Sequence, residues 1–143
     1  MRLFRALTSV SLGGMMAVAV AASPASAADG WQRAKLGGSP GSAPCIVNIL
    51  VGEGCFEPLG EWVYVKDTYA DNEPVGVVWS FSGPSSSYRE GVIYVTEGSN
   101  AGWASVNKSF PEDGWFSWRV CNVDITDGST SWCSGEETVP TGG

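Results

Sequence analysis

The chain has 143 residues and a formal net charge of −7, with four cysteines and no histidine. This length favours a single domain. The lack of histidine excludes Ser-His-Asp and Cys-His nucleophile systems, histidine general bases and His-ligated zinc. The acidic balance disfavours nucleic acid phosphates and anionic membrane surfaces as partners.

Residues 1–27 have the features of an export signal peptide. Arg2 and Arg5 begin it, residues 7–22 are mostly apolar, and Ala25-Ser26-Ala27 has the A-x-A form of a cleavage site. The alternative is an uncleaved anchor, but the interrupted apolar stretch is shorter than the roughly 20 residues of a membrane span. We therefore expect a secreted, extracellular protein. Without residues 1–27 the chain has six Lys and Arg and 15 Asp and Glu, which gives a net charge of −9.

The exported part divides into three segments by composition. Residues 28–44 are rich in Gly, Ser and Pro and predict a flexible lead-in, and residues 138–143 predict a frayed tail. Residues 45–137 between them form the expected domain. Turn residues recur there about every ten positions, and Gly52-Glu53-Gly54 is the first such turn. They separate short β-rich runs, at 46–51, 62–67, 75–82, 92–97, 102–108, 115–125 and 131–134.

This spacing predicts an all-β fold without helices. Seven or eight evenly spaced short strands are typical of a small antiparallel β-sandwich, either immunoglobulin-like or a partly open barrel. Alternation sorts the faces of each strand. It assigns to the core the apolar residues Val75, Val77, Trp79, Phe81, Phe116, Trp118 and Val120.

The four cysteines of a short exported chain predict two disulfides. Three pairings are open, and we expect Cys45–Cys55 and Cys121–Cys133 because each pair is close in sequence. A three-residue turn at 126–128 would also place Cys121 opposite Cys133. The rival interpretation is a Cys₄ zinc site, whose usual C-x₂₋₄-C spacing is absent.

Several short motifs together resemble a group of small secreted four-cysteine proteins of actinobacteria. The motifs are Gly60-Glu61, Lys66-Asp67-Thr68-Tyr69-Ala70-Asp71, Asn107-Lys108-Ser109-Phe110-Pro111-Glu112, Arg119-Val120-Cys121 and Cys133-Ser134. One departure is Asn72, where the group usually has a glycine. The resemblance implies a secreted β-domain and no catalytic residues, because no activity is established for the group.

Acidic residues allow two further interpretations, a glycosidase and a calcium site. A glycosidase needs only two carboxylates, here from Glu57, Glu61, Asp67, Glu90 or Glu112. Asp67, Asp71 and Glu73 around one turn, and Asp124 and Asp127 around another, have the oxygen chemistry of calcium ligands. A solvated acidic surface and ordinary turn chemistry also account for these residues. We therefore expect no enzyme, no metal and no cofactor.

The aromatic residues are the strongest functional signal. Alternation places Trp62, Trp103 and Trp115 with polar neighbours, and it adds Tyr64 and Arg119 to the same candidate binding set. Aromatic rings on a polar sheet face can stack on sugars or anchor a protein, although cross-strand aromatic pairs also stabilise a half-exposed sheet. The sequence thus predicts a non-catalytic module that binds a polysaccharide or cell-wall ligand.

The alternative hypothesis is a secreted interaction protein that inhibits an extracellular hydrolase. A rigid loop would then carry the function. The candidates are residues 83–90, which include Tyr88 and Arg89, and the loop closed by Cys45 and Cys55.

Overall fold

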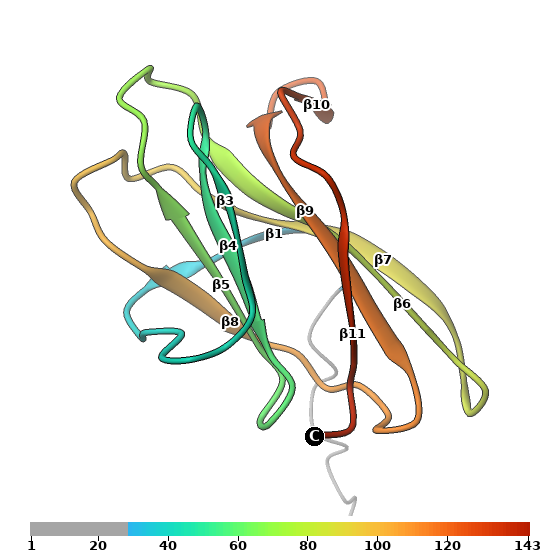
Figure 1. The fold of residues 1–143 in the computed structure, drawn as a ribbon. Coiled ribbons are helices and arrows are strands. Elements are labelled where there is room, and N and C mark those ends of the chain that lie inside the picture. The colour runs from blue at the N-terminus through green and yellow to red at the C-terminus, as the bar shows by residue number, and fades with distance from the viewer. Residues whose placement is uncertain (1–28) are drawn as a thin grey trace, which may run out of the picture.

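The computed structural model describes residues 29–143, which form eleven strands and no helix. The expected signal peptide, residues 1–27, and the expected new N-terminus, Ala28, lie outside the described residues. Figure 1 shows two sheets packed face to face. The expectation of an all-β sandwich with two disulfides is confirmed.

The larger sheet has six strands. Its order is β1 (Gly30–Arg33), β7 (Ser86–Val95), β6 (Val75–Gly83), β9 (Trp115–Asp124) and β10 (Ser129–Ser131), with β11 (Glu137–Pro140) also paired to β9. The smaller sheet has the order β2 (Lys35–Leu36), β8 (Ala104–Asn107), β5 (Trp62–Asp67), β4 (Gly52–Glu57) and β3 (Cys45–Asn48). All pairs are antiparallel except β1 with β7.

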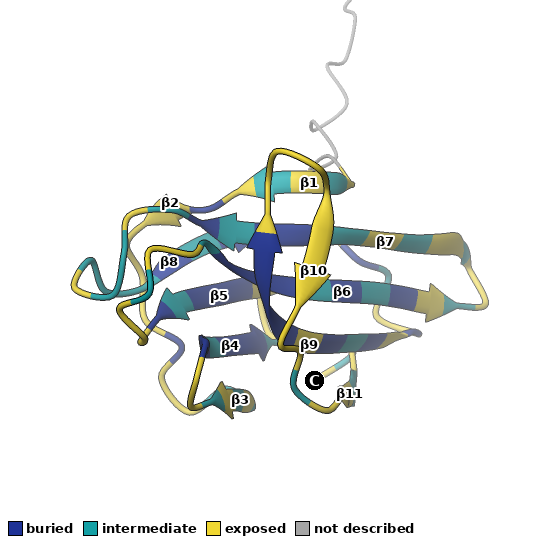
Figure 2. Cartoon of the chain, turned by 90° about the horizontal axis from the view of Figure 1, so that it is seen from above, coloured by how far each residue is buried: buried dark blue, intermediate teal, exposed yellow. Residues whose placement is uncertain are grey.

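The core lies between the two sheets and follows the predicted alternation. Both predicted core stripes, on β6 and β9, are buried there with Val63 and Val65 of β5. In Figure 2 the central strands are coloured mostly as buried, whereas β10 is coloured as exposed. Apolar burial of this kind is the main term that stabilises a small domain.

A glycine brings the two sheets into close contact at the centre of the core. A Cβ on Gly54 would lie 2.6 Å from Val77 Cγ2 and 2.7 Å from Val120 Cγ2, closer than side-chain atoms approach. At the same place the buried Trp118 Nε1 donates a hydrogen bond of 2.9 Å to the Gly54 carbonyl. Gly54 thus allows the large indole ring both to fill the core and to satisfy its polar group.

Two glycines of β4, Gly52 and Gly54, led to a wrong prediction of the strand boundaries in this region. Residues 46–51 were expected as a strand and residues 52–54 as a turn, whereas β3 ends at Asn48 and β4 begins at Gly52. Glycine commonly marks a turn. In β4 it instead serves close packing, as Gly54 shows. The remaining boundaries differ from prediction by a few residues, except that β7 begins six residues earlier than expected, at Ser86.

Both predicted disulfides are present, Cys45–Cys55 and Cys121–Cys133. The turn predicted beside Cys121 is wrong by one residue. Four residues, 125–128, separate β9 from β10, and Ser129 pairs with Asp124. The left-handed backbone of Trp132, with φ of 54°, shifts the register beyond β10, so that Ser134 N donates to the Val120 carbonyl. This irregularity still places Cys133 beside Cys121.

The lead-in and the tail differ most from expectation. Residues 30–33 and 35–36 form β1 and β2, and β11 occupies the start of the predicted frayed tail. Asp29 explains part of the order, because its carboxylate lies 2.8 Å from Arg89 Nη2 and 3.6 Å from the buried Lys108 Nζ. A partly buried ion pair and strand pairing thus order a segment whose composition predicted flexibility.

We predict that Trp118→Phe destabilises the fold by about 2–4 kcal/mol, since it removes a buried hydrogen bond and leaves a gap in the core. The matched control is Trp115→Phe on the same strand, whose ring is exposed and whose replacement changes stability by about 0.5 kcal/mol or less. Urea unfolding followed by far-UV CD measures both. Equal stability of the two variants would contradict this role for Trp118.

Candidate functional site

The outer face of the smaller sheet gathers three of the five predicted ligand-binding residues. Trp62 and Tyr64 lie on β5 with their rings 6.4 Å apart and 30° from parallel. Trp103, just before β8, meets Tyr64 edge-on at 6.4 Å. Lys66 Nζ lies 5.4 Å from the centre of the Trp103 ring, within cation–π range. The structure therefore forms a continuous aromatic row on this face.

A hollow of about 360 Å³ lies beside this row. It is called the aromatic hollow here and is lined by Lys35, Leu36, Gly37, Gly38, Trp62, Tyr64 and Ser105. Part of its wall is the chain that follows β2. A Cβ on Gly38, whose φ is +81°, would lie 3.0 Å from Tyr64 Cε1. The glycine therefore lets the backbone approach the tyrosine ring closely.

Tyr64 is buried, although alternation placed it on an exposed face. The segment around Gly38 covers its ring. Burial raises the pKa of Tyr64 above its usual value, and the neighbouring Glu57 carboxylate raises it further. The residue therefore stays a neutral phenol and forms the floor of the aromatic hollow. Trp62 remains 38% exposed and is the ring that a ligand can reach.

The other two predicted residues, Trp115 and Arg119, lie elsewhere. Both are exposed on β9, where the intervening Phe116 and Trp118 point into the core. Because β5 and β9 belong to different sheets that share this core, their outward residues lie on opposite faces of the sandwich. One ligand on a flat surface cannot contact both groups.

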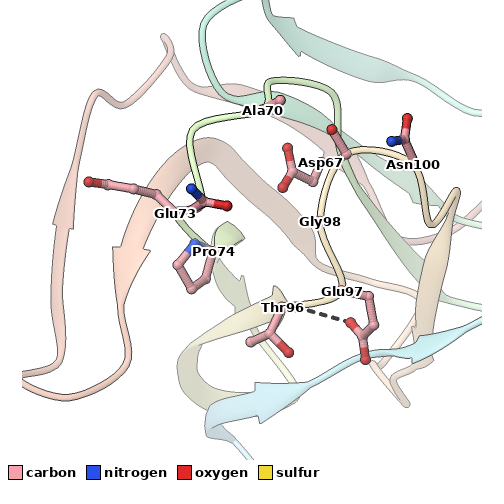
Figure 3. Close-up of a pocket in the computed structure, with 10 residues that line it drawn as sticks. Asp67, Ala70, Glu73, Pro74, Thr96, Glu97, Gly98 and Asn100 are labelled. Atoms are coloured by element: carbon pink, nitrogen blue, oxygen red, sulfur yellow. Dashed lines mark hydrogen bonds between the residues drawn. The ribbon is translucent and has the colours of Figure 1, made fainter.

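A second hollow, of about 380 Å³, is acidic. This acidic hollow is lined by Asp67, Ala70, Asn72, Glu73, Pro74, Thr96, Glu97, Gly98, Ser99 and Asn100. Figure 3 shows Asp67 at the end of β5 and Glu97 on the segment after β7. Burial raises the pKa of Asp67, a hydrogen bond from Tyr69 N opposes the rise, and the charge of Asp71 adds to it.

Local bonds occupy most of the carboxylates that suggested a calcium site. Asp67 accepts from Tyr69 N at 3.0 Å, Asp71 from Glu73 N at 2.9 Å, and Asp124 from Thr126 N at 2.8 Å. These are the side-chain bonds by which Asp stabilises turns. Within residues 29–143, no group of three or more Cys, Asp or Glu side chains is arranged to hold a metal ion.

Glu97 shows the opposite electrostatic behaviour in the same hollow. Burial acts to raise its pKa, but the 2.6 Å bond from Arg33 Nη2 and the bond from Thr96 N outweigh burial, so the pKa lies below its usual value. Its carboxylate is thus ionised and already paired with Arg33. The sequence-based carboxylate candidates did not include Glu97, because its partner lies 64 positions away.

The two loops considered for an inhibitor differ in their structure. Residues 83–90 form a tight hairpin, and Arg89 points inward to Asp29 and to the Phe110 ring at 4.7 Å. Arg89 therefore has a structural role. The loop closed by Cys45–Cys55 is the β3–β4 hairpin, whose tip exposes Ile49 and Leu50.

Comparisons with protein-family models, with curated proteins and with solved structures gave no match. The resemblance to secreted actinobacterial proteins therefore stays a prediction. No helix long and apolar enough to cross a membrane occurs in the part of the chain that the structure describes.

We predict a pH-dependent stability difference for Asp67→Asn. The folded state raises the pKa of Asp67 above 3.8, so the ionised carboxylate destabilises the fold at neutral pH. The asparagine carbonyl can still accept from Tyr69 N. The variant should be more stable than wild type at pH 7, and the difference should vanish as the pH falls below about 3.8.

Asp127→Asn is the control with the opposite sign. Hydrogen bonds from Ser129 hold the pKa of Asp127 below its usual value, so this variant loses stability at neutral pH and recovers relative to wild type in acid. Thermal unfolding between pH 3 and 7 measures both variants. A pH-independent effect of Asp67→Asn would contradict the assignment.

Proposed function

We propose that the protein is a secreted, non-catalytic binding module that holds a polysaccharide or cell-wall ligand in the aromatic hollow. The observation that carries the proposal is the exposed Trp62 ring beside a continuous aromatic row. Sugar rings present faces of C–H groups that pack on aromatic rings, while their hydroxyls need polar partners at the edges. Lys35 and Ser105 supply such partners within the hollow.

The backbone holds Trp62 in place before any ligand arrives. The preceding turn contains two left-handed residues, Gly60 and Glu61, with φ of 93° and 58°. Asn107 Nδ2 donates to the Gly60 carbonyl at 2.6 Å, and Lys108 N donates to the Glu61 carbonyl at 2.8 Å. A preorganised ring loses little conformational entropy on binding, which favours affinity at a shallow site.

The two disulfides support the proposal of secretion. Disulfides persist in oxidising compartments and are rare in the cytosol. A rigid, acidic and disulfide-linked sandwich is suited to an extracellular surface or a cell wall. The proposal makes no use of the carboxylates of the acidic hollow. Asp67 accepts a hydrogen bond within its own turn, and Glu97 is paired with Arg33.

We predict that Trp62→Ala lowers binding to the cognate polysaccharide by more than about tenfold, because a central aromatic anchor contributes about 2 kcal/mol or more. The assay is co-sedimentation of the purified protein with insoluble cellulose, chitin, xylan and peptidoglycan sacculi. Trp103→Ala should weaken binding less, because Trp103 supports Tyr64 from its edge.

Trp115→Ala is the matched control. It removes a more exposed indole, at 55%, from the opposite face and should leave binding unchanged. Near-UV CD checks that each variant is folded. Failure of the wild type to sediment with any of the four matrices would overturn the proposed ligand class. Equal losses in Trp62→Ala and Trp115→Ala would overturn the proposed site.

A further inference from the structure

A third hollow opens at the end of the sandwich where the β3–β4 turn, the β5–β6 loop and the segment after β10 meet, at the top of Figure 1. Its volume is about 260 Å³. It is called the end hollow here and is lined by Leu50, Tyr69, Asp71, Glu73, Asn122 and Trp132. None of these residues belongs to the aromatic hollow.

Trp132 forms an exposed and rigidly held wall of the end hollow. Its side chain is 70% exposed, and its backbone has a left-handed φ of 54°, which is unfavourable for a bulky residue. Asn48 Nδ2 holds it there by donating to the Trp132 carbonyl at 2.7 Å and to the Val120 carbonyl at 3.1 Å. The next residue, Cys133, is fixed by its disulfide.

The end hollow is lined by two carboxylates that have no cationic partner within the described residues. Asp71 and Glu73 form no ion pair within residues 29–143. Asn122 is only 5% exposed, and among the described residues its Oδ1 has no hydrogen-bond partner. A buried carbonyl without a partner is costly, by about 1–3 kcal/mol, unless a donor satisfies it. Within residues 29–143 the hollow therefore combines two carboxylates outside any ion pair with a buried amide oxygen that has no partner.

We propose that the end hollow binds the guanidinium group of an arginine side chain that a partner protein presents. A guanidinium is planar and stacks on aromatic rings, which Trp132 and Tyr69 supply. Its five donors can serve both carboxylates together. Its aliphatic stem can pack against Leu50.

The surroundings favour a protein as the source of the arginine. Ile49, at the tip of the β3–β4 turn, is 80% exposed, and Val47 on β3 is exposed as well. Among the strands of residues 29–143, β3 pairs only with β4, so its other edge has no strand partner there. Apolar side chains beside an acidic hollow complement a basic residue with apolar neighbours, the pattern of a protein anchor at an interface.

The test is an NMR titration of the ¹⁵N-labelled full protein with N-acetyl-arginine amide, which presents the side chain alone. The matched probes are N-acetyl-citrulline amide, which is nearly isosteric and neutral, and N-acetyl-lysine amide. We expect saturable shifts of the Trp132 indole and Asn122 amide signals with the arginine probe. The citrulline probe should cause none, and the lysine probe should bind more weakly.

The double variant Asp71→Asn with Glu73→Gln should bind the arginine probe at least about tenfold more weakly, because charge-assisted hydrogen bonds are lost. The amide oxygen introduced at position 71 can still accept from the backbone amide of position 73. The control Glu112→Gln with Glu136→Gln removes the same charge from exposed positions outside the hollow and should bind as wild type does. The double variant keeps its near-UV CD spectrum if the effect is local.

A second arm tests the protein partner. The peptide acetyl-Gly-Leu-Arg-Leu-Gly-amide should bind more tightly than N-acetyl-arginine amide, and Ile49→Ser should remove that gain without changing binding of the small probe. Absence of saturable shifts with arginine, or equal binding of arginine and citrulline, would overturn the site. Equal binding of lysine would overturn the guanidinium assignment. A peptide no tighter than the small probe would overturn the protein partner.

Discussion

The contact between Gly54 and Trp118 fixes how closely the two sheets pack at the centre of the core, and the candidate binding surface on the smaller sheet depends on it. Gly54 lies in β4 of the smaller sheet, and its carbonyl accepts the hydrogen bond that the Trp118 indole donates across the core. The absence of a side chain at Gly54 lets Val77 and Val120 approach its backbone. β5 is paired to β4, so the outward position of Trp62 follows from this packing. A tightly packed core transmits such a constraint because it has few voids.

Local patterns predicted the features of the fold that depend on single strands and near neighbours. Alternation predicted the buried faces of β6 and β9, because a half-buried strand repeats every two residues. The short spacing of the cysteines favoured the correct disulfides. Composition gave a wrong prediction where contacts between distant residues determine the structure. Asp29 orders the lead-in through Arg89, which lies 60 positions away. The glycines of β4 wrongly predicted a turn, because glycine is favoured both in turns and where two sheets pack closely together.

The candidate site was predictable only in part, for a related reason. Alternation assigns each residue to one side of its own strand, but it does not say which sheet contains that strand. Trp62 and Trp115 were therefore grouped together, although they face opposite ways. The burial of Tyr64 depends on the close approach of Gly38 from a segment that composition predicted to be flexible. The sequence marked only the turn that contains Asp71 and Glu73 of the end hollow. It did not mark Trp132, because a left-handed backbone at a tryptophan has no sequence signal.

We propose that the aromatic hollow and the end hollow divide recognition between distinct chemistries on one rigid scaffold. An aromatic, weakly polar face suits a sugar, and an acidic, aromatic end suits a basic side chain. The most direct test of the account is a ¹H–¹⁵N spectrum of the indole groups with soluble oligosaccharides of the polysaccharide that the protein sediments with. We expect saturable shifts of the Trp62 and Trp103 signals, while Trp115 and Trp132 stay unchanged. A shift of Trp115 in place of Trp62, or no indole shift at all at saturating sugar, would contradict the account.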